Sequence, residues 1–423
     1  PHKLKQDVRV DYDRAYALKD TLLDQACIRF YKKEDPEEME AFRRFKEDNA
    51  KWLDDYVLFM ACLLENDKKP WNQWDDGLAR RETQALDKAK ERLGETIKKQ
   101  YWLQYEFFSQ WMSLRTYANE KNITIIGDIP IFVDHNSADV WANKKFFEVD
   151  ETGNRLLVAG VPPDYFSETG QLWGNPLYRW EELKNDGYQW WIDRFEQMFQ
   201  MYDAIRVDHF RGFEAYWEVP ADAKTAQTGH WVKGPGEDLF TAIEKKMGKL
   251  PIIAEDLGVI TPKVVALRNR FNFPGMKVLH FAFDDPGNGF LPHNFSSANF
   301  IVYSGTHDND TSMGWYDHAP EREKHFFREY TQSDGTDVAW QLIRTAMMSV
   351  AGISIFPLQD FMELDTAHRM NFPGTTENNW LWRYTDDMLG HIDKDRIRHL
   401  IWISNRNKYE AGKDSSMSED MTD

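Results

Sequence analysis

The sequence predicts an α/β fold of the (β/α)8 TIM-barrel type with helical insertions. From residue 123 onward, short apolar runs alternate with helical segments, as in a parallel sheet with crossover helices. The runs are continuously apolar, which indicates strands covered on both faces. Polar residues collect at their C-terminal ends, where barrels of this type carry their chemistry. An open doubly wound sheet is the alternative, but no GxGxxG phosphate turn favours it.

A helical block, assigned to residues 1–122, precedes the predicted barrel. In DYDRAYALKDTLLDQACIRFY and in EEMEAFRRFKEDNAKWLDDYVLFMACLLE, apolar residues recur every three or four positions with charged residues between them. This periodicity predicts amphipathic helices from about residue 11 to residue 119. The block has no catalytic pattern, so we interpret its charged residues as solvated helix faces.

The catalytic barrel is assigned to residues 123–410, and six apolar runs are its predicted strands: 123–133, 204–210, 251–257, 276–283, 300–310 and 349–361. Predicted helices between them include 188–202, 261–271 and 336–349. A (β/α)8 barrel needs eight strands, and the helical block offers none. We therefore expect two barrel strands to be missing from this chain. Residues 411–423 are predicted to be a disordered acidic tail.

The composition narrows the possible partners. The chain has 70 acidic and 52 basic residues and a formal charge of −18, which disfavours nucleic acids and other polyanions. Cys27 and Cys62 lack the spacing and His companions of a zinc site, so we predict reduced structural thiols. No run of 18 apolar residues and no secretory signal is present. We expect a cytoplasmic protein without membrane contact.

Aromatic residues indicate a neutral, hydroxyl-rich ligand. The chain has 17 Trp, 17 Tyr and 27 Phe residues, and some lie in polar segments punctuated by Gly and Pro, such as GQLWGNPLYRW (170–180). Flat rings beside polar neighbours suit the C–H faces of sugars. Most of the other aromatic residues are expected to fill a core.

Three predicted strand ends carry acidic residues: Asp208 in IRVDHFRG, Glu255 in IIAEDLG and Asp308 in SGTHDND. We expect the three side chains to meet at the mouth of the barrel, because its strands all end there. Two carboxyl groups are what the cleavage of a glycosidic bond requires. One is ionised and attacks the anomeric carbon, and the other is protonated and releases the leaving oxygen.

The neighbours of two of these acids suggest which is which. Arg206 lies two residues before Asp208 in the same strand, so both side chains point to one face, and the guanidinium would keep the carboxylate ionised. Glu255 follows the apolar run PIIA, which predicts a raised pKa and a bound proton near neutral pH. Residue patterns alone do not choose Glu255 over Asp256.

Asp308 is the candidate third group, which could hold sugar hydroxyls and favour ring distortion. His307 and His209 offer further hydrogen-bond donors at the same mouth. The choice between Asp308 and Asp310 also stays open on residue patterns alone.

A divalent metal site is the rival interpretation of these residues. Adjacent residues of a strand face opposite ways, which disfavours joint binding of one ion by Asp208 and His209. The residues that could bind a divalent ion are Asp208, His209, Glu255, His307, Asp308 and Asp310. We therefore expect no metal. Loss of activity in EDTA, restored by metal, would overturn this expectation.

Seven ordered segments resemble the motifs of the amylomaltases, the 4-α-glucanotransferases of glycoside hydrolase family 77, and the resemblance extends from about residue 9 to about residue 408. The segments are GDIPIFVDHNSADVWAN (127–143), GVPPDYFSETGQLWGNPLY (160–178), IRVDHFRGFEAYWEVP (205–220), IIAEDLGVI (252–260), GMKVLHFAF (275–283), SGTHDNDT (304–311) and NFPGTTENNWLWR (371–383).

The resemblance implies Asp208 as nucleophile, Glu255 as general acid and base, and Asp308 as transition-state stabiliser. It implies retaining double displacement between malto-oligosaccharides or starch- or glycogen-derived α-1,4-glucans, without a cofactor. The substrate-binding residues that it implies, together with those expected at the same loops, are Arg206, His307, Asp128, Trp173, Asn175 and His209.

The chain departs from this family at its N-terminus, because full-length amylomaltases begin with two more barrel strands and a substrate-binding loop. We expect that the sequence is truncated, and the resemblance implies that the two missing strands are the first two of the barrel. Because an open barrel exposes sheet edges, we do not expect these 423 residues by themselves to be fully active. Two other functions stay open: a retaining hydrolase like the α-amylases, and an inactive glucan-binding fragment.

Overall fold

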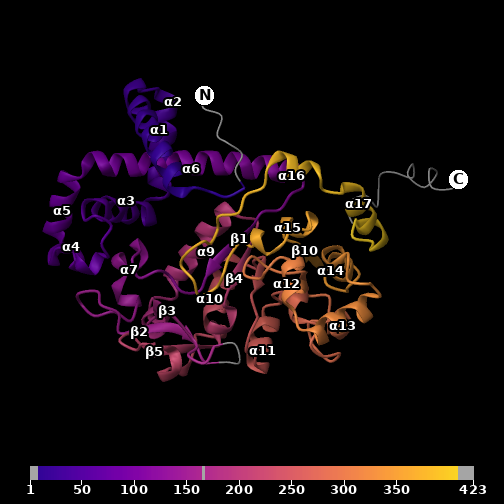
Figure 1. Cartoon of the computed structure of the whole chain (residues 1–423). Helices are drawn as coiled ribbons and strands as arrows, with labels where there is room; N and C mark the ends of the chain where they lie inside the picture. Colours follow the sequence, from indigo (N-terminus) through magenta and orange to yellow (C-terminus); the bar gives the residue numbers. More distant parts are fainter. Residues whose placement is uncertain (1–7, 164–166, 408–423) are drawn as a thin grey trace. The chain divides into compact units, whose positions relative to one another are not determined.

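The computed structural model describes residues 8–163 and 167–407, so the predicted tail lies outside the described residues. The chain folds as two compact units (Figure 1). One unit comprises Asp13–Phe273, and the other comprises Pro1–Tyr12 together with Pro274–Asp423. Each unit contains one three-stranded parallel sheet with helices packed around it.

The first part of the unit Asp13–Phe273 is helical, as its periodicity predicts. Asp35 accepts hydrogen bonds from the N–H groups of Glu37 and Glu38, and Pro36 occupies the first turn of the helix that follows, so this helix starts with its free N–H groups satisfied. The third helix packs against the sixth, which is the long helix labelled α6 in Figure 1. The helices are α1 (Tyr12–Lys33), α2 (Pro36–Asp48), α3 (Ala50–Glu65), α4 (Asp76–Arg80), α5 (Thr83–Arg92) and α6 (Gly94–Glu120).

The parallel sheet of this unit has the strand order β1-β4-β7, and each strand lies within a predicted run. In the register, Pro130 is opposite Asp208 and Val207 is opposite Ala254, so the carboxyl ends of the strands lie at one edge. The strands are β1 (Ile126–Pro130), β4 (Ala204–Asp208) and β7 (Ile252–Ala254). The helices around them are α7 (Ala138–Ala142), α8 (Trp180–Asn185), α9 (Gln189–Met201), α10 (Glu237–Met247) and α11 (Pro262–Arg270).

A second sheet in the same unit is antiparallel and does not follow from the sequence pattern. Its order is β3-β2-β5-β6, and Leu157 pairs with the distant Pro220. The strands are β2 (Leu157–Val161), β3 (Gln171–Pro176), β5 (Ala215–Pro220) and β6 (His230–Lys233). This sheet gives rigid backbone to segments that the sequence suggests to be loops.

Aromatic side chains fill the core of this unit. Trp71, Trp141 and Trp191 are fully buried and belong to one hydrophobic cluster with Phe210 and Val207. Each buried aromatic side chain removes a large apolar area from water. The expectation that most aromatic residues serve the core is confirmed for these residues.

The other unit contains a second parallel sheet, of order β10-β9-β8. Its core includes Phe283, Phe327 and Leu342, all essentially buried. The strands are β8 (Gly275–Val278), β9 (Phe300–Tyr303) and β10 (Ile353–Ile355). The helices are α12 (Ser312–His318), α13 (Glu321–Thr331), α14 (Val338–Met347), α15 (Leu358–Phe361), α16 (Asp386–Gly390) and α17 (Lys394–Ile403).

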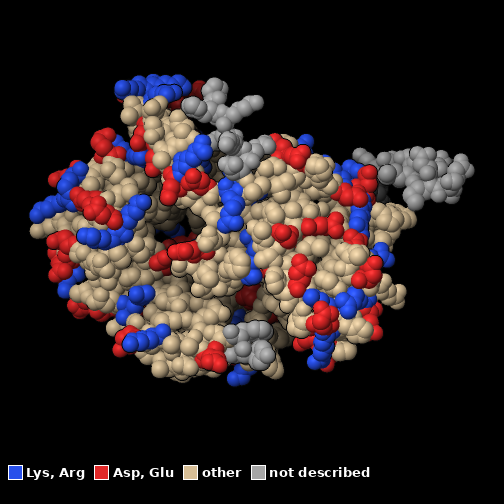
Figure 2. Space-filling view, in the orientation of Figure 1, with Lys and Arg blue, Asp and Glu red and all other residues tan. Residues whose placement is uncertain are grey.

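The surface and the thiols agree with the composition. On the face drawn in Figure 2, acidic and basic side chains of the described residues lie intermixed. Cys27 and Cys62 are buried free thiols, and burial raises the pKa of Cys62 to about 11, as expected of an unreactive structural thiol. Within the described ranges, no helix has both the length and the apolar character needed to cross a membrane.

Candidate active site

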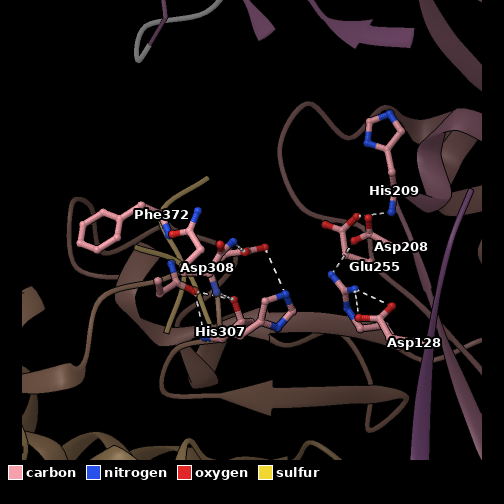
Figure 3. A network of polar contacts seen from close by, with 12 residues as sticks. Asp128, Asp208, His209, Glu255, His307, Asp308 and Phe372 are labelled. Carbon is pink, nitrogen blue, oxygen red and sulfur yellow. Dashed lines mark hydrogen bonds and ion pairs between the residues drawn. The ribbon is translucent and has the colours of Figure 1, made fainter. Parts of the chain in front are cut away.

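Two acidic residues stand side by side at the carboxyl edge of the sheet β1-β4-β7. Asp208 is the last residue of β4, and Glu255 directly follows β7. The Glu255 N–H group donates to the carbonyl of Val207 at 3.0 Å, and the Phe210 N–H group donates to the carbonyl of Glu255 at 3.0 Å. These backbone bonds hold the two strand ends together, and Figure 3 shows the two carboxyl groups next to each other.

Arg206 shares the face of Asp208, as its spacing of two residues predicts. One guanidinium nitrogen lies 2.8 Å from Asp208 Oδ1, and another donates to both carboxylate oxygens of Asp128 at 2.9 and 2.7 Å. Burial lowers the pKa of Arg206, but the charges of Asp208 and Asp128 outweigh this effect and raise its pKa overall. Arg206 is therefore a fixed positive charge between two carboxylates.

Glu255 has the opposite environment. Its side chain is 9% exposed and accepts hydrogen bonds from the N–H groups of His209 at 2.8 Å and Leu257 at 3.0 Å. Burial and then the nearby charge of Asp208 raise the pKa of Glu255 to about 7, although Arg206 and the two N–H groups oppose the shift. The raised pKa predicted from the apolar run PIIA is confirmed. The pair thus combines Asp208, whose carboxylate is paired with a guanidinium, with Glu255, whose pKa of about 7 lets a large share of its carboxyl groups hold a proton as the pH approaches neutral.

This raised pKa predicts a pH-dependent stabilisation by Glu255→Gln. The ordinary pKa of the group is 4.5, and its pKa in the folded protein is about 7. Between these two values the unfolded chain has lost the Glu255 proton while the folded chain still holds it, so rising pH lowers the stability of the wild type. This loss of stability levels off above pH 7. The free energy of unfolding that the wild type loses over this pH range is on the order of 3 kcal/mol. Glutamine cannot ionise, so the thermal midpoint of the variant relative to the wild type should rise by several degrees between pH 4.5 and pH 8. An unchanged difference would contradict the raised pKa.

Asp256 is already engaged elsewhere. It forms a buried ion pair with Arg268 of α11, and both residues are at least nine-tenths buried. A buried charge needs such a partner. Residue patterns left Glu255 and Asp256 as alternatives. The Asp256 carboxylate pairs with Arg268, whereas the Glu255 side chain accepts from the backbone N–H groups of His209 and Leu257, and the catalytic role of Glu255 stays a prediction.

His209 contributes through its backbone. It has a left-handed φ of 51°, which directs its N–H group to Glu255 Oε2. Its ring points away from the carboxyl groups in Figure 3 and meets Trp173 edge to face, with centroids 4.8 Å apart. Burial lowers the pKa of His209 to about 4, so the ring is neutral at physiological pH.

Trp173 and Asn175 both lie on β3, in the antiparallel sheet. The Trp173 ring is 39% exposed and therefore presents an aromatic face beside His209. Asn175 donates from its side-chain nitrogen to the carbonyl of Val133 at 3.0 Å. This bond ties β3 to the segment that follows β1. The substrate-binding role of both residues stays a prediction.

Asp308 and His307 lie in the other unit, in the loop between β9 and α12. Asn371 donates from its side chain to Asp308 Oδ1 at 2.6 Å, and Arg369 donates to the Asp308 carbonyl at 2.7 Å. His307 Nε2 lies 3.5 Å from Asp308 Oδ2, as drawn in Figure 3. The Asp308 side chain is nonetheless 42% exposed, so it is held in place and still accessible.

Asp310, two residues on, is used within the fold. Its carboxylate accepts the N–H group of Thr311 at 2.8 Å and the hydroxyl of Thr366 at 2.9 Å. Its side chain is 14% exposed, against 42% for Asp308. Asp308 is thus the more accessible of the two carboxyl groups, and its catalytic role stays a prediction.

Asn371 and Trp380 are site neighbours to which the sequence analysis assigned no role. The Trp380 ring lies 5.2 Å from that of His307 and is 49% exposed. Both residues belong to the segment NFPGTTENNWLWR (371–383). Its density of Asn and Trp was the available signal, but only the fold shows that Asn371 contacts Asp308.

In the described part of the chain, no group of three or more His, Cys, Asp or Glu side chains has an arrangement that could hold a metal ion. The ring of His209 also points away from Asp208 in Figure 3; His209 lies just beyond the end of β4 and has left-handed backbone.

Comparisons with known proteins agree with one another. A family model described as 4-alpha-glucanotransferase, glycoside hydrolase family 77, matches residues 2–388. The 4-alpha-glucanotransferase of Thermus thermophilus is 48% identical over 406 residues, which are 94% of this chain and 81% of that protein. The 4-alpha-glucanotransferase of Synechocystis is 50% identical over 407 residues, which are 95% of this chain and 81% of that protein.

A solved structure of similar fold carries a ligand. The amylomaltase from Streptococcus agalactiae in complex with acarbose matches with a TM-score of 0.91 and 37% identity, over 95% of this chain and 81% of that chain.

Proposed function

Because the chain belongs to the 4-alpha-glucanotransferase family and has that family's activity, we propose that it transfers α-1,4-glucan segments by a retaining double displacement at Asp208 and Glu255. The observation that carries this proposal is the contrast between the two adjacent carboxyl groups. Asp208 faces the Arg206 guanidinium at 2.8 Å, whereas Glu255 is buried and has a pKa of about 7.

In the first step, Asp208 attacks the anomeric carbon of the donor from the face opposite the glycosidic oxygen. The bond from that carbon to the oxygen breaks, and Glu255 gives its proton to the oxygen, so that the shortened glucan leaves with a free 4-hydroxyl. The product is a glucosyl ester of Asp208. Arg206 and its second partner, Asp128, fix the direction of attack.

In the second step, the 4-hydroxyl of an acceptor sugar attacks the same carbon. It loses its proton to the Glu255 carboxylate while the ester bond to Asp208 breaks, so the α configuration returns and Glu255 is again protonated. Transfer exceeds hydrolysis when an acceptor is held in place and water is excluded. The exposed ring of Trp173 is the proposed acceptor platform, with His209 behind it and with Asn175 anchoring the same strand.

Asp308 and His307 are assigned to the same reaction. In this proposal the Asp308 carboxylate accepts hydrogen bonds from sugar hydroxyls that strengthen in the oxocarbenium-like transition state, and His307 donates to the sugar. The proposal is supported by the accessibility of Asp308 and by the two donors, Asn371 and Arg369, that hold it.

The proposal has further parts. The substrates are malto-oligosaccharides and starch- or glycogen-derived α-1,4-glucans, the steps above use no cofactor or metal, and the location is cytoplasmic. The six parallel strands are proposed to belong to a (β/α)8 barrel, with residues 123–410 as the catalytic part and residues 1–122 as a helical insertion.

Incubation with maltotriose tests the activity. Disproportionation is expected to yield free glucose and a ladder of longer oligomers, which chromatography resolves, because the maltosyl group passes to another maltotriose. Glucose and maltose alone would identify a hydrolase. If no product forms and Asp208→Asn changes nothing, the chain is an inactive glucan-binding fragment.

A further inference from the structure

A buried carboxylate underlies the loop that carries Asp308. Asp360, in α15, is 1% exposed and receives three hydrogen bonds. Its Oδ1 accepts the Ser312 N–H group at 3.0 Å, and its Oδ2 accepts the hydroxyls of Ser304 at 2.5 Å and Ser312 at 2.7 Å. A buried carboxylate with this many donors is fully satisfied and rigid.

The partners of Asp360 are the two ends of the Asp308 loop. Ser304 directly follows β9, and Ser312 is the first residue of α12. Everything between them, including His307 and Asp308, is thus attached at both ends to one side chain. Surface loops are mobile unless their ends are tied, and here a single group ties both.

His280 extends the network beneath the loop. Its Nε2 lies 3.0 Å from Ser312 Oγ, and its ring stacks on Trp315 with centroids 5.1 Å apart. The backbone of Gly305 passes so close that a Cβ there would lie 2.8 Å from His280 Nδ1. The Ser312 hydroxyl donates its hydrogen to Asp360. In the contact between Ser312 and His280 the Ser312 oxygen is therefore the acceptor, and His280 Nε2 carries the proton that is donated. Burial lowers the pKa of His280 to about 3, in keeping with this neutral ring.

We propose that Asp360 is a positioning residue for glucan transfer, which acts through Ser304 and Ser312 on the loop that holds Asp308 and His307. The inference rests on the role proposed for Asp308. Asp308 is 42% exposed. Within its own loop it contacts His307 and Thr306, and from outside the loop Arg369 and Asn371 donate to it. The Asp360 network supplies the opposing anchor.

Asp360→Asn tests the proposal, because the amide nitrogen cannot accept a hydrogen bond, so at least one of the three hydrogen bonds to Asp360 is lost. The expected result is a kcat for maltotriose that is about 10-fold to 100-fold lower per folded molecule, the size of effect that a misplacement of about 1 Å produces. KM should stay within about threefold, because the affected contact strengthens in the transition state.

A double-variant cycle separates positioning from general damage. If Asp360 acts through Asp308, Asp360→Asn should lower kcat by less than about threefold in an Asp308→Asn background, because the effects of one functional unit are not additive. An equal loss in both backgrounds, or an unchanged kcat in the wild-type background, would overturn the proposal. Full activity of Asp308→Asn alone would instead refute the role of Asp308.

Two sets of variants complete the design. Asp337→Asn makes the same chemical change at the ion pair with Arg396 in the same unit, so it should alter thermal stability and leave kcat unchanged. If Asp360→Asn does not fold, Ser304→Ala and Ser312→Ala each remove one contact of the carboxylate. A loss of kcat that disappears in the Asp308→Asn background supports the proposal for them as well, and additive losses reject it.

Discussion

Asp208→Asn should lower kcat for maltotriose disproportionation by on the order of 10⁴-fold, which corresponds to about 5.5 kcal/mol of transition-state stabilisation. The amide has nearly the shape of the carboxylate but cannot form the glucosyl ester, so double displacement loses its first step. It also leaves Arg206 without the charge that faces it at 2.8 Å. Initial rates of glucose release measure the effect.

The control for this variant lies at the other end of the same strand. Asp203→Asn alters a carboxylate that pairs with Arg115 at 2.7 Å and accepts from Asn119, just before β4. It should change stability and leave kcat intact. A comparable loss in Asp203→Asn would mean that any charge change near β4 disables the protein.

Azide gives a sharper test of the nucleophile. In Asp208→Ala with an α-glucosyl fluoride donor, azide can occupy the space of the lost carboxylate and attack the anomeric carbon, so the expected product is the β-glucosyl azide. An azide product of α configuration would assign the nucleophile to a different group.

Glu255→Gln should lower kcat for maltotriose by about 10²-fold to 10⁴-fold, the usual range for a lost general acid. The glucosidic oxygen would leave without a proton, and the acceptor hydroxyl would attack without a base. An α-glucosyl fluoride donor should restore much of the first step, since fluoride needs little help from an acid. Rates with both donors measure the difference, and equal losses would contradict an acid role.

The pH profile adds a second criterion. Because the pKa of Glu255 lies at about 7, the protonated acid is lost as pH rises, so kcat/KM for maltotriose should fall above pH 7. This fall above pH 7 should be absent when the Glu255→Gln variant reacts with the α-glucosyl fluoride donor. The matched control is Asp256→Asn with Arg268→Gln, which removes both charges of the neighbouring buried pair and should keep the wild-type profile.

The sequence predicted the parallel strands and main helices well, because each has a local signal. The run at 251–257 contains β7, and TPKVVALRNRF contains α11, which begins with Thr261 as its cap and Pro262 in its first turn. The antiparallel sheet was not predicted. Its strands pair residues as distant as Leu157 and Pro220, and short segments rich in Gly, Pro and Trp carry little strand periodicity.

For the site, the sequence by itself determined that Asp208 and Glu255 stand at strand ends, that Arg206 and Asp208 share a face, and that Glu255 follows an apolar run. It did not determine the place of Asp308, which lies in the loop after β9 and not at the end of the strand. These properties depend on residue order alone, through the alternation of a strand. Only the tertiary structure decided that Asp256 is bound by Arg268, that Asp310 is held by Thr366, and that burial and the charge of Asp208 bring the pKa of Glu255 to about 7. Burial and charge are supplied by segments distant in the chain, and they set a carboxyl group's pKa and its availability.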